Sequence, residues 1–450
     1  MLTRASDRRV KRLPRDPGPA AWSALLAPPA PARPLEEAVT ADWLVIGGGF
    51  AGLAAARRLA QLRAPERIVL LEARRIGEGP AGRNSGFMID LPHDLASGGY
   101  GGAVEADRRQ IAMNRAAIAF AAGAVEEYAL PREAFDPGGK INAAATGRGV
   151  GQNRAYARHL EVLGEPHDWL DAGAMRALTG TDYYLGGLRT PGTVILQPAM
   201  FVRGVAAGLG RAVALHEDAP VVRLARAGPD WRAETPTGSV TAPRVILAVN
   251  GHAESFGYFE RRLMHVFTYA SMSRRLTADE VRRLGGEPRW GLTPADPMGT
   301  TVRRISGTGG DRILVRNRFT YDPSMEVPET RLAAVACSHD ASFAARFPML
   351  AGVEMEYRWG GGLCLSRNGV PAFGEVEDGV FSACCQNGLG LARGTLAGML
   401  AADLATRSNN PMLADLTGLA PPRPLPPEPL TWLGATTRIR WEEWQAGREL

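Results

Sequence analysis

Residues 42–62 read DWLVIGGGFAGLAAARRLAQL, and this stretch decides the fold. A short apolar run ends in three glycines, and the apolar residues of 53–62 then recur with helical spacing. Residues 67–72, RIVLLE, are a second apolar run of the kind found in parallel sheets that are covered on both faces. The pattern predicts a β-α-β unit whose first turn lies at the glycines.

The glycines of this turn fit a dinucleotide-binding site. Gly47 permits a tight turn, Gly49 lets a pyrophosphate approach the backbone, and Gly52 lets helix and strand pack closely. The helix N-terminus then faces the phosphate charge. Glu72 ends the second apolar run, where an acid about twenty residues past the glycines accepts hydrogen bonds from ribose hydroxyls. These features predict a bound dinucleotide.

Two further loops favour FAD over a nicotinamide cofactor. Residues 81–86, AGRNSG, form a glycine-flanked polar loop that a simple nicotinamide-binding fold does not need. The apolar run 379–385 is predicted as a strand, and Gly388 to Gly390 then open a second helix. Two helix N-termini can serve one large cofactor, one at the pyrophosphate and one at the electron-rich flavin edge.

Other segments predict a second layer. Residues 264–273 alternate between two faces, and together with 312–319 they indicate an antiparallel sheet outside the dinucleotide-binding core. Residues 106–130 are predicted as one long helix, and 245–249 as another buried strand. The irregular stretch 73–103 is too long for a plain connector and is expected to wrap around something.

The basic residues are unevenly distributed. The formal net charge of the 450 residues is +5, and residues 1–16 alone hold six basic and two acidic side chains. We expect the Pro- and Arg-rich residues 1–40 to be an extended strap or a disordered leader, with order beginning at Asp42. Because the remaining chain is nearly neutral and has no basic stripe, nucleic acid is not expected as a partner. Only Lys11 and Lys140 are lysines.

Cysteine, histidine and hydropathy patterns exclude other classes. Four cysteines are too few for a disulfide scaffold and are not spaced as metal-ligand pairs, so we expect a reducing, cytoplasmic compartment. The seven histidines are scattered, and no metal site is predicted. No apolar run approaches the roughly 18 residues that would span a bilayer, so no membrane partner is expected.

From about Asp42 to Leu404 the chain resembles the D-amino-acid oxidase superfamily of FAD-dependent oxidoreductases. Within it, the chain is most similar to the γ-glutamylputrescine oxidase-like and glycine–sarcosine oxidase-like branch. The resemblance rests on VIGGGFAGLAAA, LEARRIGEGPAGRNSGF, VILAVNG, YRWGGGLCLSRNGVPAFG and DGVFSACCQNGLGLARGTLAG, in this order. It implies an α/β fold, α+β overall: a Rossmann-like FAD/NAD(P)-binding domain of the glutathione-reductase type with an interleaved antiparallel-sheet substrate domain.

The resemblance also implies which residues bind FAD. Some relatives attach FAD through a histidine in the loop matching 82–86, which has none here, and others through a cysteine with which Cys364 is out of register. Non-covalent FAD is therefore expected. The FAD-binding residues implied are Gly47, Gly49, Phe50, Ala51, Gly52, Glu72, Ala73, Arg74, Gly82, Arg83, Asn84, Ser85, Gly86, Val221, Asn250, Trp359, Gly360, Gly388, Leu389 and Gly390.

The implied activity is oxidation of the C–N bond of an amine or amino acid by hydride transfer to flavin N5. The resulting imine would hydrolyse to an aldehyde or keto acid. An arginine fork binds carboxylate and a tyrosine or histidine can hold an amine, so the substrate-site candidates are His265, Tyr269, Arg303 with its neighbour Arg304, Arg316 and Tyr321. Sarcosine-oxidase-type relatives place a lysine above the flavin in a strand matching 312–319, where this chain has none. Oxygen or another electron acceptor, and hence oxidase or dehydrogenase, stay open.

Two alternatives to this activity stay open. The chain could be an FAD-binding subunit of a multi-subunit dehydrogenase or electron-relay complex, or form an oligomer, docked through its terminal arms. It could also act on tRNA-linked amines.

The expected domain division is an N-terminal extension at 1–40, an FAD-binding domain at 41–138, 202–257 and 355–406, a substrate domain at 139–201 and 258–354, and a C-terminal Pro-rich arm at 407–450, which should be exposed.

Overall fold

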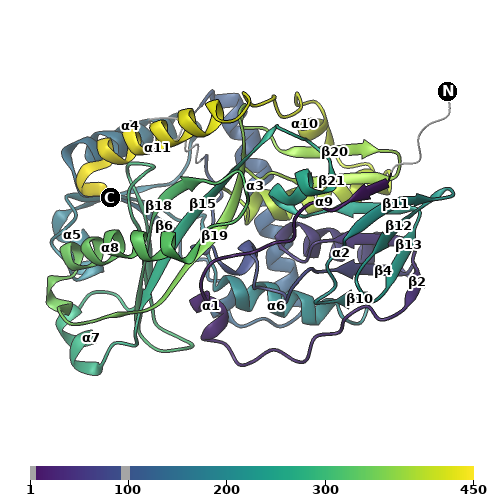
Figure 1. Ribbon diagram of the computed structural model, residues 1–450. Helices are drawn as coiled ribbons and strands as arrows, with labels where there is room; N and C mark the ends of the chain where they lie inside the picture. The colour runs from purple at the N-terminus through teal and green to yellow at the C-terminus, as the bar shows by residue number, and fades with distance from the viewer. Residues whose placement is uncertain (1–6, 93–101) are drawn as a thin grey trace.

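The computed structural model describes residues 7–92 and 102–450, which form two halves, each built on a large sheet (Figure 1). In the first half a six-stranded sheet has the order β10-β4-β3-β14-β21-β20, and all neighbours are parallel except β20 and β21. Its strands are β3 (Trp43–Ile46), β4 (Ile68–Leu71), β10 (Val213–His216), β14 (Arg244–Leu247), β20 (Ala372–Glu377) and β21 (Val380–Cys384).

This sheet is buried on both faces, which explains its uninterrupted apolar strands. Val45 packs on one side with helices α2 (Phe50–Leu62), α3 (Val104–Glu127), α6 (Pro198–Leu209) and α9 (Ala392–Ala405). Leu44 and Ile46 pack on the other side against Trp231 of a five-stranded sheet. That sheet has the order β1-β11-β12-β13-β2, with β1 at Asp7–Arg9, β2 at Ala38–Thr40, β11 at Arg223–Ala227, β12 at Asp230–Glu234 and β13 at Ser239–Ala242. The predicted β-α-β unit, β3-α2-β4, is confirmed.

The second half contains the predicted antiparallel pair, β15 (Leu263–Ser273) and β18 (Arg312–Tyr321), within a larger sheet than the alternation indicated. Its order is β19-β15-β18-β17-β16-β6-β8-β7. Helix α8 (Glu329–Arg346), which we did not predict, packs on β15, β18 and β19. The other strands are β6 (Lys140–Ala144), β7 (Asp168–Asp171), β8 (Gly186–Thr190), β16 (Trp290–Pro294), β17 (Thr301–Ile305) and β19 (Met355–Ser366), and further helices are α4 (Gly147–Leu163), α5 (Ala172–Thr179) and α7 (Ala278–Leu284).

Residues 7–40 form an ordered N-terminal strap, so the expectation that order begins at Asp42 is wrong. Strand β1 (Asp7–Arg9) pairs with β11, the chain crosses to α1 (Ala21–Ala24), and it returns to β2 (Ala38–Thr40) beside β13 (Figure 1). The strap lacks periodicity because it is held by the rest of the chain rather than by its own hydrogen bonds. Its basic residues face acids there: Arg8 pairs with Glu377 at 2.9 Å and Lys11 with Glu260 at 2.5 Å.

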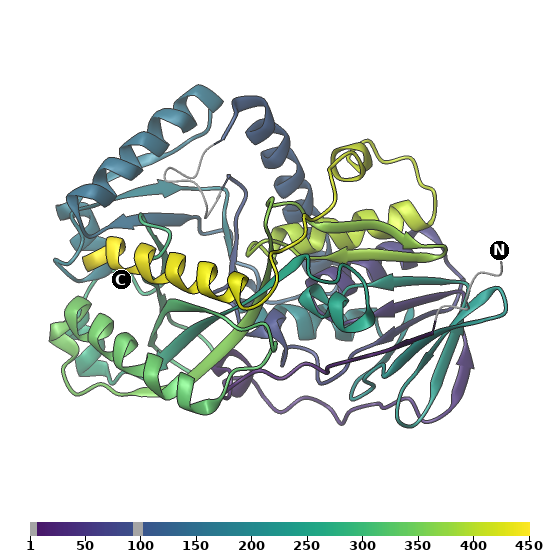
Figure 2. The same cartoon turned by 45° about the horizontal axis from the view of Figure 1, so that its top comes forward.

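The C-terminal arm is only partly exposed. Helix α11 (Leu430–Ala446) contacts β18 and lies across the second half (Figure 2). Beyond it, the buried Glu449 carboxylate accepts hydrogen bonds from the amides of Ala145 and Thr146, at 2.8 and 3.0 Å. Trp441 and Trp444 remain on the exposed side of the helix. Within the described ranges, no helix is both long and apolar enough to cross a bilayer.

The strap should contribute measurably to stability. Trp22 is 1% exposed and packs with Ala199, Met272 and Trp359. We expect Trp22→Ala to lower the free energy of unfolding by about 3–5 kcal/mol, because a buried indole is replaced by a cavity. Chemical denaturation measures this change. Trp444→Ala, which removes a 72% exposed indole, is the control and should change the free energy by no more than about 0.5 kcal/mol; equal effects of the two substitutions would contradict the packing of the strap.

Candidate functional site

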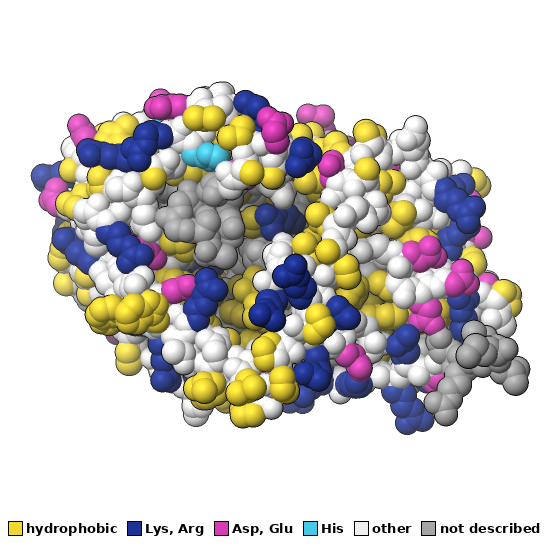
Figure 3. All heavy atoms as spheres, turned by 90° about the horizontal axis from the view of Figure 1, so that it is seen from above, with side chains coloured by type: hydrophobic (Ala, Val, Ile, Leu, Met, Phe, Trp, Pro, Cys, Tyr) yellow, Lys and Arg dark blue, Asp and Glu magenta, His cyan; other side chains and the backbone are white. Residues whose placement is uncertain are grey.

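A cavity of about 360 Å³ lies where the two halves meet. Its wall includes the glycine turn after β3, the end of β4, the loop before α9 and the inner residues of β15. The molecule is also visibly hollowed between its halves when seen from above, with basic side chains around the hollow and acidic ones nearby (Figure 3). The cavity thus joins the dinucleotide-binding motif to the antiparallel sheet.

The glycine turn leaves room for a phosphate at the start of α2. Gly47 has a φ of +103°, and a Cβ on Gly52 would lie 1.7 Å from the Gly47 carbonyl oxygen, so both positions require glycine. A Cβ on Gly49 would meet only the Ala81 methyl, at 3.6 Å. Helix α2 has neither a side-chain cap nor an acid in its first turn, so its first N–H groups can bind an anion.

Glu72 follows β4 and points back to this turn. Its carboxylate accepts hydrogen bonds from the Gly48 amide at 2.7 Å and from the Arg74 amide at 3.1 Å. Burial raises the pKa of Glu72, and the two amide bonds act in the opposite direction. The fixed carboxylate keeps lone pairs for hydroxyl donors such as those of a ribose.

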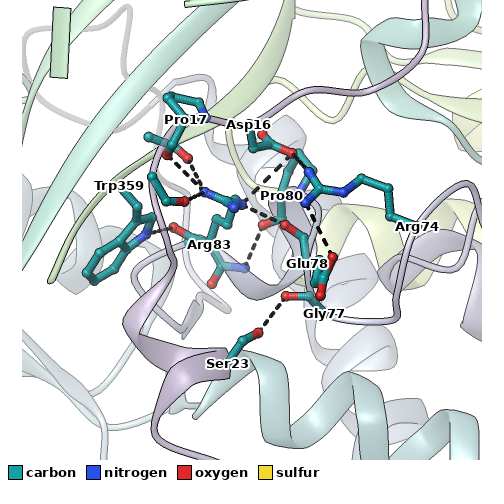
Figure 4. A network of polar contacts seen from close by, with 12 residues as sticks. Asp16, Pro17, Ser23, Arg74, Gly77, Glu78, Pro80, Arg83 and Trp359 are labelled. Carbon is teal, nitrogen blue, oxygen red and sulfur yellow. Dashed lines mark hydrogen bonds and ion pairs between the residues drawn. The ribbon is translucent and has the colours of Figure 1, made fainter. Parts of the chain in front are cut away.

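Residues 77–86 form a loop, the 77–86 loop, which Arg83 connects to the strap (Figure 4). The guanidinium donates to the carbonyls of Glu78 at 2.6 Å, Gly18 at 2.9 Å, and Pro17 and Gly360 at 3.1 Å each. Because its Nε and Nη1 groups donate to these carbonyls and its Nε lies 3.9 Å from Asp16 Oδ2, Arg83 serves to join the loop, the strap and β19.

Two tryptophans hold the same loop. Trp22 of the strap donates its indole N–H to the Asn84 carbonyl at 2.8 Å, and Trp359 of β19 donates to the Arg83 carbonyl at 2.9 Å. The irregular stretch 73–103 was expected to wrap around something, and the 77–86 loop does line the cavity. Residues 93–101 of that stretch lie outside the described residues.

Most residues expected to bind FAD line this cavity. Gly52, Gly82, Trp359 and Gly360 do not, and instead make the close contacts that shape the turn and the 77–86 loop. The lining includes Gly47, Gly49, Phe50, Ala51, Glu72, Ala73, Arg74, Arg83, Asn84, Ser85, Gly86, Val221, Asn250, Gly388, Leu389 and Gly390.

The substrate-site candidates are divided by the structure. His265, Tyr269 and Arg316 line the cavity. His265 Nε2 lies 2.7 Å from Glu254 Oε2, and the Tyr269 hydroxyl lies 2.6 Å from Thr320 Oγ1. Burial raises the pKa of Tyr269 to about 12.

Arg303, Arg304 and Tyr321 lie outside the cavity lining. Arg303 donates to the Ser85 carbonyl at 2.8 Å from behind the 77–86 loop, and the Tyr321 hydroxyl donates to Glu428 of the C-terminal arm at 2.6 Å. Strand alternation in the sequence could not assign them, because the neighbouring segment that covers each of them comes from far away in the chain.

Several lining residues were not anticipated. The strap contributes Val10 and residues 12–16, where the absence of periodicity gave no signal. Asn250 Oδ1 and Thr268 Oγ1 are buried in this wall without a hydrogen-bond partner in the described part of the chain. Asp16 Oδ2 is also buried there and lies 3.9 Å from guanidinium nitrogens of Arg74 and Arg83, with which it forms ion pairs. FAD carries ribityl and ribose hydroxyls and a pyrophosphate, so unpaired polar atoms beside an open helix N-terminus fit this cofactor. No cluster of metal-ligating side chains occurs among the described residues.

Comparison with known proteins finds relatives that cover most of the chain. The family model of FAD-dependent oxidoreductases (DAO) matches residues 42–404. A probable oxidoreductase OrdL of Rhizobium meliloti is 28% identical over 81% of this chain and 83% of its own, and gamma-glutamylputrescine oxidoreductase of Escherichia coli is 27% identical over 83% and 86%. Glycine oxidase from Geobacillus kaustophilus superposes with a TM-score of 0.67 at 19% identity, covering 83% of this chain and 96% of that one. L-proline dehydrogenase from P. horikoshii superposes with a TM-score of 0.65 at 16% identity, covering 83% of this chain and 95% of that one.

Adding one methyl group to the glycine turn tests its role in FAD binding. Gly52→Ala places a Cβ against the Gly47 carbonyl oxygen, so the turn must shift and we expect FAD to bind at least about tenfold more weakly. Fluorescence titration of the apoprotein with FAD measures this. Gly151→Ala in α4 adds the same methyl where no atom lies within 4 Å, and it should leave the FAD Kd unchanged while stabilising α4 by up to about 1 kcal/mol. Unchanged FAD binding by Gly52→Ala would refute the role of the turn.

Proposed function

Because this chain belongs to the family of FAD-dependent oxidoreductases, we propose that it oxidises the carbon–nitrogen bond of a small amine or amino acid. One observation carries the proposal: a single cavity extends from the glycine turn to the inner face of β15. A cofactor held at the turn can therefore reach the sheet that bears the candidate substrate groups. The similar proteins named for γ-glutamylputrescine, glycine and L-proline support an amine or amino acid as the substrate class.

The residues that would hold FAD follow from their positions. The N-terminus of α2 would bind the pyrophosphate, Glu72 the adenosine ribose, and the 77–86 loop would lie along the flavin. When bound, FAD would supply the electron-accepting chemistry for oxidising the carbon beside the amine to an imine, which water would hydrolyse. Cys364 is buried and its pKa is raised well above the usual range by burial, so its thiol is held protonated and FAD stays non-covalent.

The chain itself positions the substrate and keeps the cavity dry. Arg316 places a guanidinium in the wall, where it would bind a substrate carboxylate. Tyr269 keeps its hydroxyl proton at neutral pH because of its raised pKa, and would orient the amine by hydrogen bonding. His265 is bonded to Glu254, so we assign it to holding the substrate end of the cavity in place.

We infer that oxygen reacts slowly at this site. No lysine is among the cavity-lining residues of the described chain, so no ammonium group is available beside the flavin to stabilise charge on reduced oxygen. The natural electron acceptor would then differ from oxygen, and the protein would act as a dehydrogenase. Fast reoxidation of the reduced protein by air in stopped flow would overturn this inference.

The proposed function is tested by anaerobic addition of an amine and amino-acid panel to the FAD-loaded protein. We expect at least one compound to bleach the flavin absorbance near 450 nm, because two electrons enter the cofactor. A yellow protein that no member of the panel bleaches would refute amine oxidation. A protein that binds no added FAD would refute the cofactor assignment.

Arg316→Met adds a check on the substrate class. We expect it to slow bleaching by amino acids at subsaturating concentration about 10–100-fold, the loss of one charge-assisted hydrogen bond, with a smaller effect on amines that lack a carboxylate. Arg318→Met is the matched control on the same strand. The Arg318 guanidinium bonds Glu443 and Ser338 instead of lining the cavity, so bleaching should stay unchanged.

A further inference from the structure

A second cavity, of about 410 Å³, shares no lining residue with the first. It lies behind the 77–86 loop and is lined by residues of β6, β16 and β17, with Trp22 of the strap in its wall. Arg303 separates the two cavities, because its guanidinium stacks over Trp22 and donates to the Ser85 carbonyl of the first cavity. Volumes of this size accommodate small organic ligands.

Three buried cations face this second cavity. Lys140 is 2% exposed, Arg304 3% and Arg303 6%, and all three line it. Their hydrogen-bond partners are neutral: Lys140 bonds Asn142 and Thr293, and Arg304 bonds the Gly285 carbonyl. Within residues 7–92 and 102–450, none of the three forms an ion pair, and the Nε–H groups of both arginines lack a hydrogen-bond acceptor.

Burial lowers the pKa of all three cations more than the acids near them raise it. Asp136 and Glu133 act on Arg303, Glu287 and Asp311 on Arg304, and Asp90 on Lys140, without forming ion pairs with them. Glu133 accepts hydrogen bonds from Thr308, and Asp136 pairs with Arg132 at 3.0 Å. Glu287, the remaining acid of the lining, is exposed. Buried cations without a counter-ion are costly, and proteins keep them where a ligand supplies the opposite charge.

We propose that this second cavity binds a small oxyanion, with the Lys140 ammonium and the Arg303 guanidinium, which leave the same face of the sheet, as its donors. Arginine Nε–H groups and an ammonium match carboxylate or phosphate oxygens. Trp22 and Trp290 supply apolar wall, which favours an organic carboxylate over a bare inorganic ion. Burial lowers the pKa of Lys140 to about 8 and of Arg303 to about 9, and a bound anion would raise both pKa values again by stabilising the charged forms.

The site would be linked to the cofactor cavity. Lys140 Nζ bonds Thr293 Oγ1, and Thr293 lines the first cavity, as Ser85 does. An anion held by Lys140 and Arg303 would therefore act on two residues of the first wall. The site requires no FAD chemistry, so it stands or falls independently of the proposed function.

The test titrates FAD-loaded protein with sodium succinate and, separately, with sodium phosphate, each against sodium chloride of equal ionic strength. We expect succinate to raise the Tm in a saturable manner, as a ligand that binds only the folded state does. The flavin absorbance should stay unchanged, because FAD is not displaced. Saturation by phosphate alone would keep the oxyanion assignment and make the ligand inorganic. If neither anion stabilises the protein beyond chloride, the proposal is wrong.

Variants locate the binding. Lys140→Met should weaken anion binding at least about tenfold by calorimetry. Arg304→Met should weaken it less, because the Arg304 side chain leaves the opposite face of β17. Lys140→Met should also leave the ligand-free Tm unchanged or higher, because it removes an uncompensated buried charge. Arg57→Met is the matched control: this buried arginine has a counter-ion, Glu127 at 2.6 Å, so its loss should lower the Tm and leave anion affinity intact. Anion affinity retained in Lys140→Met would overturn the proposal, and so would a Lys140→Met Tm that falls as in Arg57→Met.

Discussion

The buried guanidinium of Arg83 is the contact on which the cofactor cavity depends. It bonds carbonyl oxygens of the strap, of the 77–86 loop and of β19, three segments that lie far apart in the chain. Left without these acceptors, a buried cation would cost several kcal/mol, roughly the stability margin of a domain. Bringing the three segments together supplies these acceptors, and the cavity wall forms as a consequence.

This constraint explains how two dissimilar sheets produce one site. The parallel sheet presents the glycine turn and Glu72 at the carboxyl ends of its strands, where open α/β sheets bind their ligands. The antiparallel sheet contributes Tyr269 of β15 and Arg316 of β18 to the cavity wall. The 77–86 loop lies between them and is fixed on both sides by indole N–H groups. Cofactor and substrate groups consequently share one enclosed space.

The sequence predicted those parts of the fold that depend on local pattern. The β3-α2-β4 unit could be predicted because its apolar runs and glycines are contiguous, and the pairing of β15 with β18 because both strands alternate. The strap could not be predicted, because its order comes from partners such as Glu377 that are hundreds of residues away. Arg303 shows the same limit in the site: it was grouped with the substrate residues, yet it supports the 77–86 loop from behind.

FAD affinity tests most directly whether the strap is part of the cofactor site. The measurement compares the FAD Kd of the full chain with that of a chain lacking residues 1–18, both checked for cooperative unfolding. The deletion deprives Arg83 of the Pro17 and Gly18 carbonyls and of its ion-pair partner Asp16, and it removes the strap residues that line the cavity. We expect the shortened chain to bind FAD at least about tenfold more weakly, which is a loss of about 1.4 kcal/mol or more of binding free energy. An equal Kd in two folded proteins would contradict this role of the strap.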